Sequence, residues 1–298
     1  MVNPEVRTTK GTKESISKRD SQPLSKVIAE NRDRNRLRPI EGRHNPLVKE
    51  LRRAFAHGEL TPDGYCAIDG VRILEEAIRS GLRFRAVFFS NSTQNKAARL
   101  LPQIGANVET LLLPDKLFAS AVPSETPQGV AALVRWKEHS PDDVIARAQA
   151  GPVLAIAGVQ DPGNLGTILR SAEALGAAGV LLGEGTVSPF NSKLVRASAG
   201  SVFRVPIARI KLHPMLGAMR AQGLRLIATS SHKGVPLPEA KLTAPLAIFI
   251  GSEGGGLPRD LMSEMDEVVV IPHSSKVESL NAAIAASIVL YEISRQRQ

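Results

Sequence analysis

The sequence of 298 residues contains one cysteine, Cys66, which excludes a disulfide within the chain and is typical of a reducing compartment. Its six histidines lack the spacing of a metal site, and a single cysteine cannot form the Cys-x-x-Cys pair of many zinc sites. The longest apolar runs, 152–159 and 282–291, are shorter than the roughly 20 residues of a membrane-spanning helix. No apolar stretch follows the basic N-terminal residues, as it would in a secretory signal. We therefore expect a cytoplasmic protein with no metal and no membrane segment.

Acidic residues are outnumbered, and the excess of positive charge is concentrated at one end of the chain. The net charge is +9, and residues 1–53 hold 14 Lys and Arg against 7 Asp and Glu. This imbalance favours a polyanionic partner such as a nucleic acid, although a solubilising tail is the alternative. Residues 1–37 are rich in charge and poor in apolar side chains, which predicts a disordered basic tail.

The rest of the chain is expected to form two α/β regions. Residues 38–135 alternate β-like runs with amphipathic segments and predict a small α/β domain. Residues 136–150 predict a linker helix, because Ser140-Pro-Asp-Asp143 is a helix start signal. In residues 151–298, continuous apolar strands alternate with helices, which predicts a parallel sheet covered on both faces. Its expected strands are 153–159, 180–182, 203–205, 224–229, 246–250 and 268–271.

A first loop candidate follows the strand at 153–159. Asp161-Pro-Gly-Asn164 is a turn sequence, and Asn164 is expected to cap the helix that follows. Apolar residues from Leu165 onward form one stripe of that helix, and Arg170 lies about 100° beyond it. Taken alone, Asn164 could be a simple cap and Arg170 a solvated helix charge.

A second loop candidate, Gly251-Ser-Glu-Gly-Gly-Gly256, follows the strongly apolar strand at 246–250. Several glycines let a backbone turn sharply and approach a ligand without interference from Cβ atoms. The loop has neither the Lys-Ser/Thr of a phosphate-binding loop nor the glycine spacing of a dinucleotide site. A nucleotide-dependent oxidoreductase is therefore disfavoured.

The third candidate runs from Ile271 to Asn281 and leads into an apolar helix expected over 278–295. Ser275 and Glu278 have the spacing of a capping box and could be purely structural. Ser279 and Asn281 are polar residues at the start of an otherwise apolar helix, where they would have no role unless they contact another group.

In this order, the three segments resemble the signature motifs of the SpoU/TrmH family of SPOUT RNA methyltransferases. The resemblance implies transfer of a methyl group from S-adenosyl-L-methionine to a ribose 2′-hydroxyl of RNA. It also implies a deep trefoil knot in the C-terminal domain and a homodimer with a shared active site. The chain departs from the family at Pro272-His-Ser-Ser-Lys276, where a Pro-Met-Gly-like stretch is usual, which leaves the shape of this loop open.

The resemblance also assigns roles to individual residues. The implied catalytic residues are Asn164, Arg170, Glu253, Ser279 and Asn281. The implied cofactor contacts are Thr229, Ser230, Gly251, Gly254, Ile271, Pro272 and Leu280. A guanidinium keeps its proton at neutral pH, so we interpret Arg170 as a phosphate anchor and a stabiliser of the developing alkoxide. Ser279 or a water would then relay the proton.

Residues 40–135 resemble the ribosomal-protein-like substrate-binding domain that precedes many members of this family. The matching segments are 45–51, 69–72 and 124–130. Arg43, Lys49 and Arg72 are the expected RNA contacts, although each could equally be a surface charge. The domain type favours rRNA over tRNA as the substrate. A catalytically silent RNA-binding or ribosome-assembly protein is the alternative, and the intact set of implied catalytic residues weighs against it.

Overall fold

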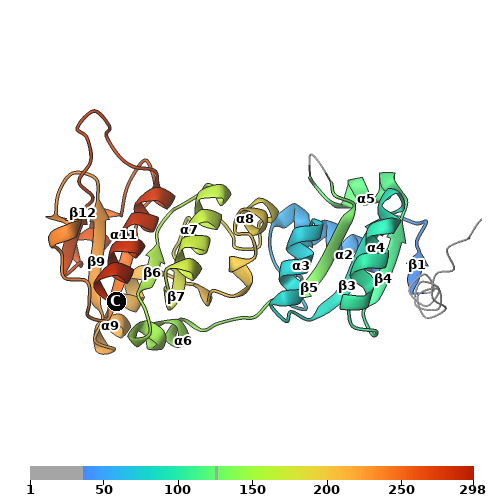
Figure 1. The fold of residues 1–298 in the computed structure, drawn as a ribbon, viewed down its shortest axis with the longest axis horizontal. Coiled ribbons are helices and arrows are strands. Elements are labelled where there is room, and N and C mark those ends of the chain that lie inside the picture. Colours follow the sequence, from blue (N-terminus) through green and yellow to red (C-terminus); the bar gives the residue numbers. More distant parts are fainter. Residues whose placement is uncertain (1–35, 125–126) are drawn as a thin grey trace, which may run out of the picture.

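The computed structural model describes residues 36–124 and 127–298 and consists of two units, each built around one β-sheet (Figure 1). We call residues 37–135, around a five-stranded sheet, the N-terminal unit, and residues 141–297, around a seven-stranded sheet, the C-terminal unit. Nearly all of the expected basic tail, residues 1–35, lies outside the described residues.

The sheet of the N-terminal unit is mixed, with the strand order β1-β4-β3-β5-β2. Strands β1, β4 and β3 are parallel, and β5 runs antiparallel to β3 and β2. Helices α2 and α5 cover one face, and α3 and α4 cover the other. The strands are β1 Leu37–Pro39, β2 Tyr65–Asp69, β3 Phe84–Ser90, β4 Glu109–Leu113 and β5 Val130–Arg135, and the helices are α2 Pro46–His57, α3 Val71–Arg79, α4 Gln94–Leu100 and α5 Asp115–Ala121.

All strands of the C-terminal sheet are parallel, in the order β10-β12-β9-β11-β6-β7-β8, as expected for a strictly alternating α/β sequence. The strands are β6 Val153–Ile156, β7 Gly179–Leu182, β8 Ile207–Arg209, β9 Arg225–Ser230, β10 Val235–Pro236, β11 Leu246–Ile250 and β12 Glu267–Val270. The helices are α6 Pro141–Ala146, α7 Pro162–Ala174, α8 Ser192–Ala197, α9 Leu212–Ala221, α10 Arg259–Ser263 and α11 Ala282–Gln296. No helix in the described part of the chain is long and apolar enough to cross a membrane.

Both faces of the C-terminal sheet are buried, which explains why its strands are continuously apolar. In β6, Leu154 and Ile156 face the layer of α7 and α11, whereas Val153 and Ala155 face the layer of α6 and α9. This alternation follows from the two-residue period of a strand. The three-layer α/β architecture confirms the expected fold class, and the trefoil knot stays a prediction.

Three local expectations were wrong. The strand expected at 203–205 is displaced: Ser201–Phe203 forms a 3₁₀ turn, and β8 begins only at Ile207. Asn164 does not cap α7, because Asp161 lies at the N-cap and accepts from Asn164 N, with Pro162 as the first helical residue. Helix α11 begins at Ala282 with Asn281 as its N-cap, so the capping box expected from Ser275 does not form.

The end of α11 is fixed to the loop before β11. Gln296 Nε2 donates to Ala240 O at 3.0 Å, and Gln296 Oε1 accepts from Leu242 N at 2.9 Å. Arg297 Nη2 donates to Ala244 O at 2.7 Å. Hydrogen bonds from Arg295 and Gln296 lower the pKa of Glu292 to about 2, so this carboxylate stays charged at neutral pH. The contacts of Gln296 and Arg297 hold the C-terminal end of α11 against residues 240–244.

Helices α7 and α8 approach each other closely at Gly166. A Cβ atom at this position would lie 2.5 Å from Ala197 Cβ and 2.9 Å from Ser198 N. A side chain here would therefore push α8 away from α7. Gly217 also lies inside an α-helix, α9, but a Cβ atom there would meet nothing within 4 Å.

We expect opposite effects from replacing these two helical glycines with alanine. Gly217→Ala should raise the free energy of unfolding by up to about 1 kcal/mol, the usual gain in helix propensity. Gly166→Ala should lower it by about 1–3 kcal/mol, because overpacking outweighs that gain. Urea denaturation of both variants measures the difference, and a stabilised Gly166→Ala protein would contradict the close approach of α7 and α8.

Candidate active site

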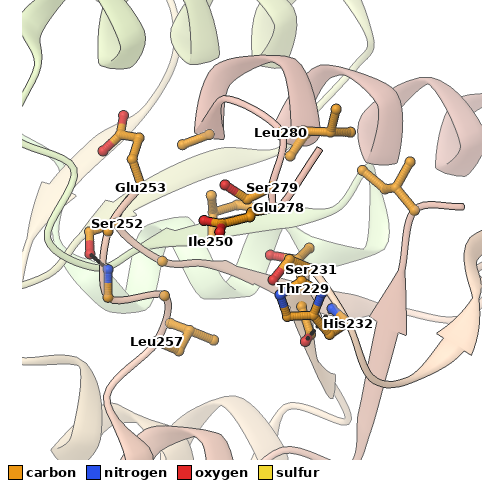
Figure 2. Close-up of a pocket in the computed structure, with 18 of the residues that line it drawn as sticks. Thr229, Ser231, His232, Ile250, Ser252, Glu253, Leu257, Glu278, Ser279 and Leu280 are labelled. Carbon is orange, nitrogen blue, oxygen red and sulfur yellow. Dashed lines mark hydrogen bonds between the residues drawn. The ribbon is translucent and has the colours of Figure 1, made fainter. Parts of the chain in front are cut away.

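A cavity of about 510 Å³ opens at the carboxyl ends of the neighbouring strands β9, β11 and β12 (Figure 2). Ligands of parallel α/β sheets generally bind at this edge. The segment from Glu278 to Ala285, which includes the start of α11, closes one side. Figure 2 shows Glu253 towards one end of the cavity and His232 towards the other, with Ser279 between them.

The loop between Gly251 and Gly256 forms one wall and folds back on itself. Ser252 N donates to Gly256 O at 3.2 Å, and Gly256 N donates to Ser252 O at 3.0 Å. A Cβ atom on Gly251 would lie 2.1 Å from the carbonyl carbon of Gly256, so only glycine fits there. Gly254, by contrast, has open space around its Cα atom. The glycines thus permit a closed turn with exposed backbone at its tip.

Asn164 joins this loop to the two other motifs. Asn164 Nδ2 donates to Glu253 Oε1, and Asn164 Oδ1 accepts from Asn281 Nδ2 at 3.0 Å. Asn281 Oδ1 is already occupied, since it accepts from Ala283 N at 2.9 Å as the cap of α11. The cap therefore fixes which end of the Asn281 amide faces Asn164. Side chains from three distant segments form one hydrogen-bonded chain beside the cavity.

The third motif is an irregular segment between β12 and α11. His273 Nδ1 lies 2.7 Å from Ile271 O, and because a carbonyl only accepts, Nδ1 carries the proton. Val277 N donates to Ser274 O at 3.1 Å and closes a turn. This turn places Glu278 and Ser279 at the cavity wall.

The structure brings most of the implied site residues together. Among the implied catalytic residues, Glu253 and Ser279 line the cavity. Asn164 donates a hydrogen bond to Glu253, and Asn281 donates one to Asn164. Of the implied cofactor contacts, all but Pro272 line the cavity, namely Thr229, Ser230, Gly251, Gly254, Ile271 and Leu280. Arg170 does not line it. The Arg170 side chain is exposed. Arg170 follows Asn164 by six residues on α7, so the two side chains point in directions about 240° apart around the helix axis.

The implied RNA contacts belong to two helix layers on opposite faces of the N-terminal sheet. Arg43 lies just before α2 and Lys49 lies in its first turn, and both are exposed. Helix α2 covers one face of the N-terminal sheet. Arg72 is exposed in the first turn of α3, which covers the opposite face. An RNA that touches all three residues would have to pass around an edge of the unit.

Several cavity residues lie outside the loops expected from the sequence. They are Ser231, His232, Ile250, Leu257, Met262, Ala282 and Ala285. The polar residues Ser231 and His232 directly after β9 were a usable signal, because such positions lie at the ligand-binding edge of a parallel sheet. No comparable signal marked Met262, which reaches the cavity from α10.

The lining suits an elongated organic ligand with both polar and apolar parts. Ile250, Leu257 and Leu280 supply apolar walls, while Ser231, Ser252 and Ser279 supply hydroxyl groups. The volume falls within the range of about 300–1,000 Å³ that is usual for small-molecule sites. Among residues 36–124 and 127–298, no three His, Cys, Asp or Glu side chains are grouped to hold a metal ion.

Comparisons with known proteins agree with this geometry. Residues 151–291 match the SpoU rRNA Methylase family, and residues 45–132 match the MRM3-like substrate binding domain. The chain is 32% identical over 257 residues to the 23S rRNA (guanosine(2553)-2′-O)-methyltransferase RlmP of Bacillus subtilis, covering 86% of this chain and 99% of that protein. It is 34% identical over 175 residues to the 23S rRNA (guanosine-2′-O-)-methyltransferase RlmB of Vibrio parahaemolyticus, covering 57% of this chain and 71% of that protein.

Two solved structures have a similar fold over most of the chain. The AdoMet-bound rRNA methyltransferase from Sinorhizobium meliloti superposes with a TM-score of 0.74 at 29% identity, covering 87% of this chain and 98% of that one. The SpoU methyltransferase AviRb from Streptomyces viridochromogenes, in complex with AdoMet, superposes with a TM-score of 0.73 at 28% identity, covering 85% and 98%.

Replacing Asn164 with Asp tests the hydrogen-bonded chain. The variant sets a carboxylate against Glu253, so the folded protein should hold one carboxyl with a raised pKa. A raised acid pKa means that stability falls as pH rises through it. We expect the variant to be destabilised by about 1 kcal/mol more at pH 7.5 than at pH 4.5, measured by urea denaturation against the parent protein.

Asn191→Asp is the matched control. Asn191 caps α8 by accepting from Lys193 N and Leu194 N, a role that a carboxylate fills equally well. The helix N-terminus stabilises that negative charge, so the control should gain stability as pH rises. An Asn164→Asp deficit that does not change with pH would mean that residue 164 does not contact Glu253.

Proposed function

The chain belongs to the SpoU rRNA methylase family, and we propose that its cavity at β9, β11 and β12 is the site at which it methylates a guanosine ribose of 23S rRNA. The protein is an S-adenosyl-L-methionine-dependent rRNA 2′-O-ribose methyltransferase. The observation that carries the site assignment is the hydrogen-bonded chain Glu253–Asn164–Asn281, which gathers three motifs beside one cavity. The proposed domains are a substrate-binding domain over 38–135 and a methyltransferase domain over 151–298, joined by a linker helix over 136–150.

The cavity residues fit the cofactor. The exposed backbone at Gly254 and the polar ends of β9 at Thr229 and Ser230 offer hydrogen-bonding groups. Ile271 and Leu280 supply apolar contacts and backbone groups on the opposite wall. Bound S-adenosyl-L-methionine would supply a methyl group bonded to a positively charged sulfonium sulfur. Once the methyl group is transferred, the sulfur would be left as a neutral thioether.

The protein must then position a ribose oxygen and manage its proton. Glu253 is held by Asn164, so its carboxylate keeps one orientation at the cavity wall. Ser279 lies at the same wall and can accept or pass on a proton through its hydroxyl. Arg170 stays positively charged, so its role is to bind RNA phosphate and to stabilise the negative charge that develops on the 2′-oxygen.

The guanosine substrate is inferred from the relatives. RlmP of Bacillus subtilis and RlmB of Vibrio parahaemolyticus are both named for 2′-O-methylation of guanosine in 23S rRNA. The match of residues 45–132 to a substrate-binding domain supports recognition of the RNA by the N-terminal unit. A tRNA substrate is the competing possibility.

We also propose that the protein acts as a homodimer. Ile284 and Tyr291 are seven residues apart on one side of α11 and are 54% and 60% exposed, which is unusual for large apolar side chains. Helix α11 packs beside α7, the helix that carries Arg170. Because Arg170 does not line the cavity of its own chain, a second copy docked on α11 offers a way to complete the site.

Methyl transfer can be tested with tritium-labelled S-adenosyl-L-methionine. Total rRNA and tRNA from a strain that lacks the protein serve as acceptors, followed by digestion to nucleosides. We expect label in 2′-O-methylguanosine from 23S rRNA, and about a hundredfold slower transfer by Arg170→Ala, because a stabilising charge is lost. A 23S fragment with 2′-deoxyguanosine at the modified position should accept none. Label in tRNA alone would contradict the substrate, and no label in either RNA would contradict the activity.

The dimer can be tested by placing a charge on the exposed side of α11. Ile284→Lys and Tyr291→Lys should convert a dimer to a monomer at micromolar concentration, because a buried lysine in an apolar contact is costly. Ala221→Lys, at an exposed position on α9, is the control and should leave the mass unchanged. Light scattering coupled to gel filtration measures the mass. A dimer that survives both α11 substitutions would contradict this interface.

A further inference from the structure

The two units meet in a continuous contact beside α7 and α8. One apolar cluster contains Ile68 and Leu74 of the N-terminal unit together with Leu194 and Val202 of the C-terminal unit. Trp136 packs edge-on against Phe190, with ring centroids 4.8 Å apart and planes at 89°. Figure 1 shows α3 and α8 on either side of this junction.

Arg204 binds a carboxylate from each unit. Its Nη1 donates to Glu76 Oε2 at 3.0 Å and to Ser80 Oγ at 3.1 Å, both from the α3 region of the N-terminal unit. Its Nε donates to Glu173 Oε1 and its Nη2 to Glu173 Oε2 at 3.1 Å, on α7 of the C-terminal unit. A guanidinium has enough donors in one plane to hold both carboxylates at a fixed angle. Lysine has no such fork.

A second ion pair crosses the junction at α8. Arg196 Nη1 lies 2.6 Å from Asp69 Oδ1, and the Asp69 side chain is only 5% exposed. Asp69 ends β2, and only Gly70 separates it from the start of α3. On the same helix α8, Lys193 Nζ lies 3.9 Å from Asp161 Oδ2, at the start of α7. Helix α8 therefore contacts both the N-terminal unit and the helix that carries Asn164.

These contacts join the helix faces to which the proposed function assigns RNA binding and catalysis. Arg72 and Glu76 are four residues apart on α3, so they lie on one face. Arg170 and Glu173 are three residues apart on α7 and also share a face. Arg204 connects Glu76 to Glu173 and thus links these two faces through one side chain.

We propose that Arg204, supported by Arg196, is a positioning residue for methyl transfer. It fixes the angle at which the N-terminal unit presents bound rRNA to α7 and the cavity, so the inference rests on the proposed function. Domains joined within one chain move relative to each other unless their interface is large and hydrophobic. Apolar contacts at this junction have no fixed direction, and the ion pairs of Arg204 and Arg196 add directional ones. A displacement of about 1 Å in a reacting group can slow a reaction about a hundredfold. A fixed angle between the units therefore matters to turnover.

A pair of spin labels, one in each unit, tests whether the two units are held in a fixed position, because the spread of the distances between the labels reports their relative motion. Cys66 is fully buried, and burial raises its pKa to about 12, so it does not compete for thiol reagents. Cysteines introduced at the exposed positions Asn95 and Gln222 place one label in each unit. We expect a narrow distribution of label distances in the parent protein and a broad one in Arg204→Gln and Arg196→Gln. Glu76→Gln, which removes the same bond from the other side, should broaden it too.

Kinetics on a 23S rRNA fragment test the functional part. Arg204→Gln should lower kcat/KM for the RNA about tenfold, while the Kd for S-adenosyl-L-methionine stays unchanged, because the cavity is intact. Arg204→Lys should recover less than half of that loss. The control Arg99→Gln removes an ion pair of Arg99 with Glu75 inside the N-terminal unit and should change neither distances nor rates.

An unchanged distance distribution in Arg204→Gln would overturn the proposal, and so would a broadened distribution with normal kcat/KM. A loss of cofactor binding in this variant would also overturn it, because Arg204 would then support the cavity rather than the angle between the units. If the parent protein transferred no methyl group to rRNA, the proposed function would fail instead. The label distances do not depend on turnover and would still decide whether Arg204 fixes the two units.

Discussion

The amide of Asn164 binds two other parts of the chain, at Glu253, 89 residues away in sequence, and at Asn281, 117 residues away. It donates to Glu253 and accepts from Asn281, and Asn281 in turn caps α11. The glycine loop, the start of α7 and the start of α11 are therefore fixed relative to one another at the carboxyl edge of the sheet. The glycine loop and the segment at the start of α11 form walls of the cavity, together with the ends of β9, β11 and β12, and the start of α7 holds these walls through Asn164.

The fold class could be predicted because it depends on patterns that are local in sequence. Continuous apolar strands such as β11 indicated a sheet buried on both faces, and the structure has helices on both. The position of β8 could not be predicted in this way. Phe203 and Val205 have strand-like side chains, but Gly200, with a φ of 93°, begins a tight turn there, and pairing with β7 selects Ile207–Arg209. Pairing with a distant strand has no local signature.

The site was predicted in part, for similar reasons. The motifs indicated Glu253, Ser279 and the end of β9, which line the cavity. Asp and Asn both favour the N-cap, but Pro162 was a usable sequence signal that Asp161 rather than Asn164 caps α7, because proline is favoured at the first helical position. Freed from the cap, Asn164 can bind Glu253. Met262 and the contacts of Arg204 depend on how separate elements pack, and no spacing in the sequence encodes that.

The anchoring of α11 has a consequence for how the protein is made. Every described strand precedes α11 in the chain, and the cavity wall from Glu278 to Ala285 follows the last of them. The contacts of Gln296 and Arg297 with residues 240–244 come later still. A ribosome therefore releases the whole parallel sheet before the residues that close the cavity. The growing chain can build most of its core while it is still attached, but the cavity lacks one of its walls until residues 278–285 have emerged.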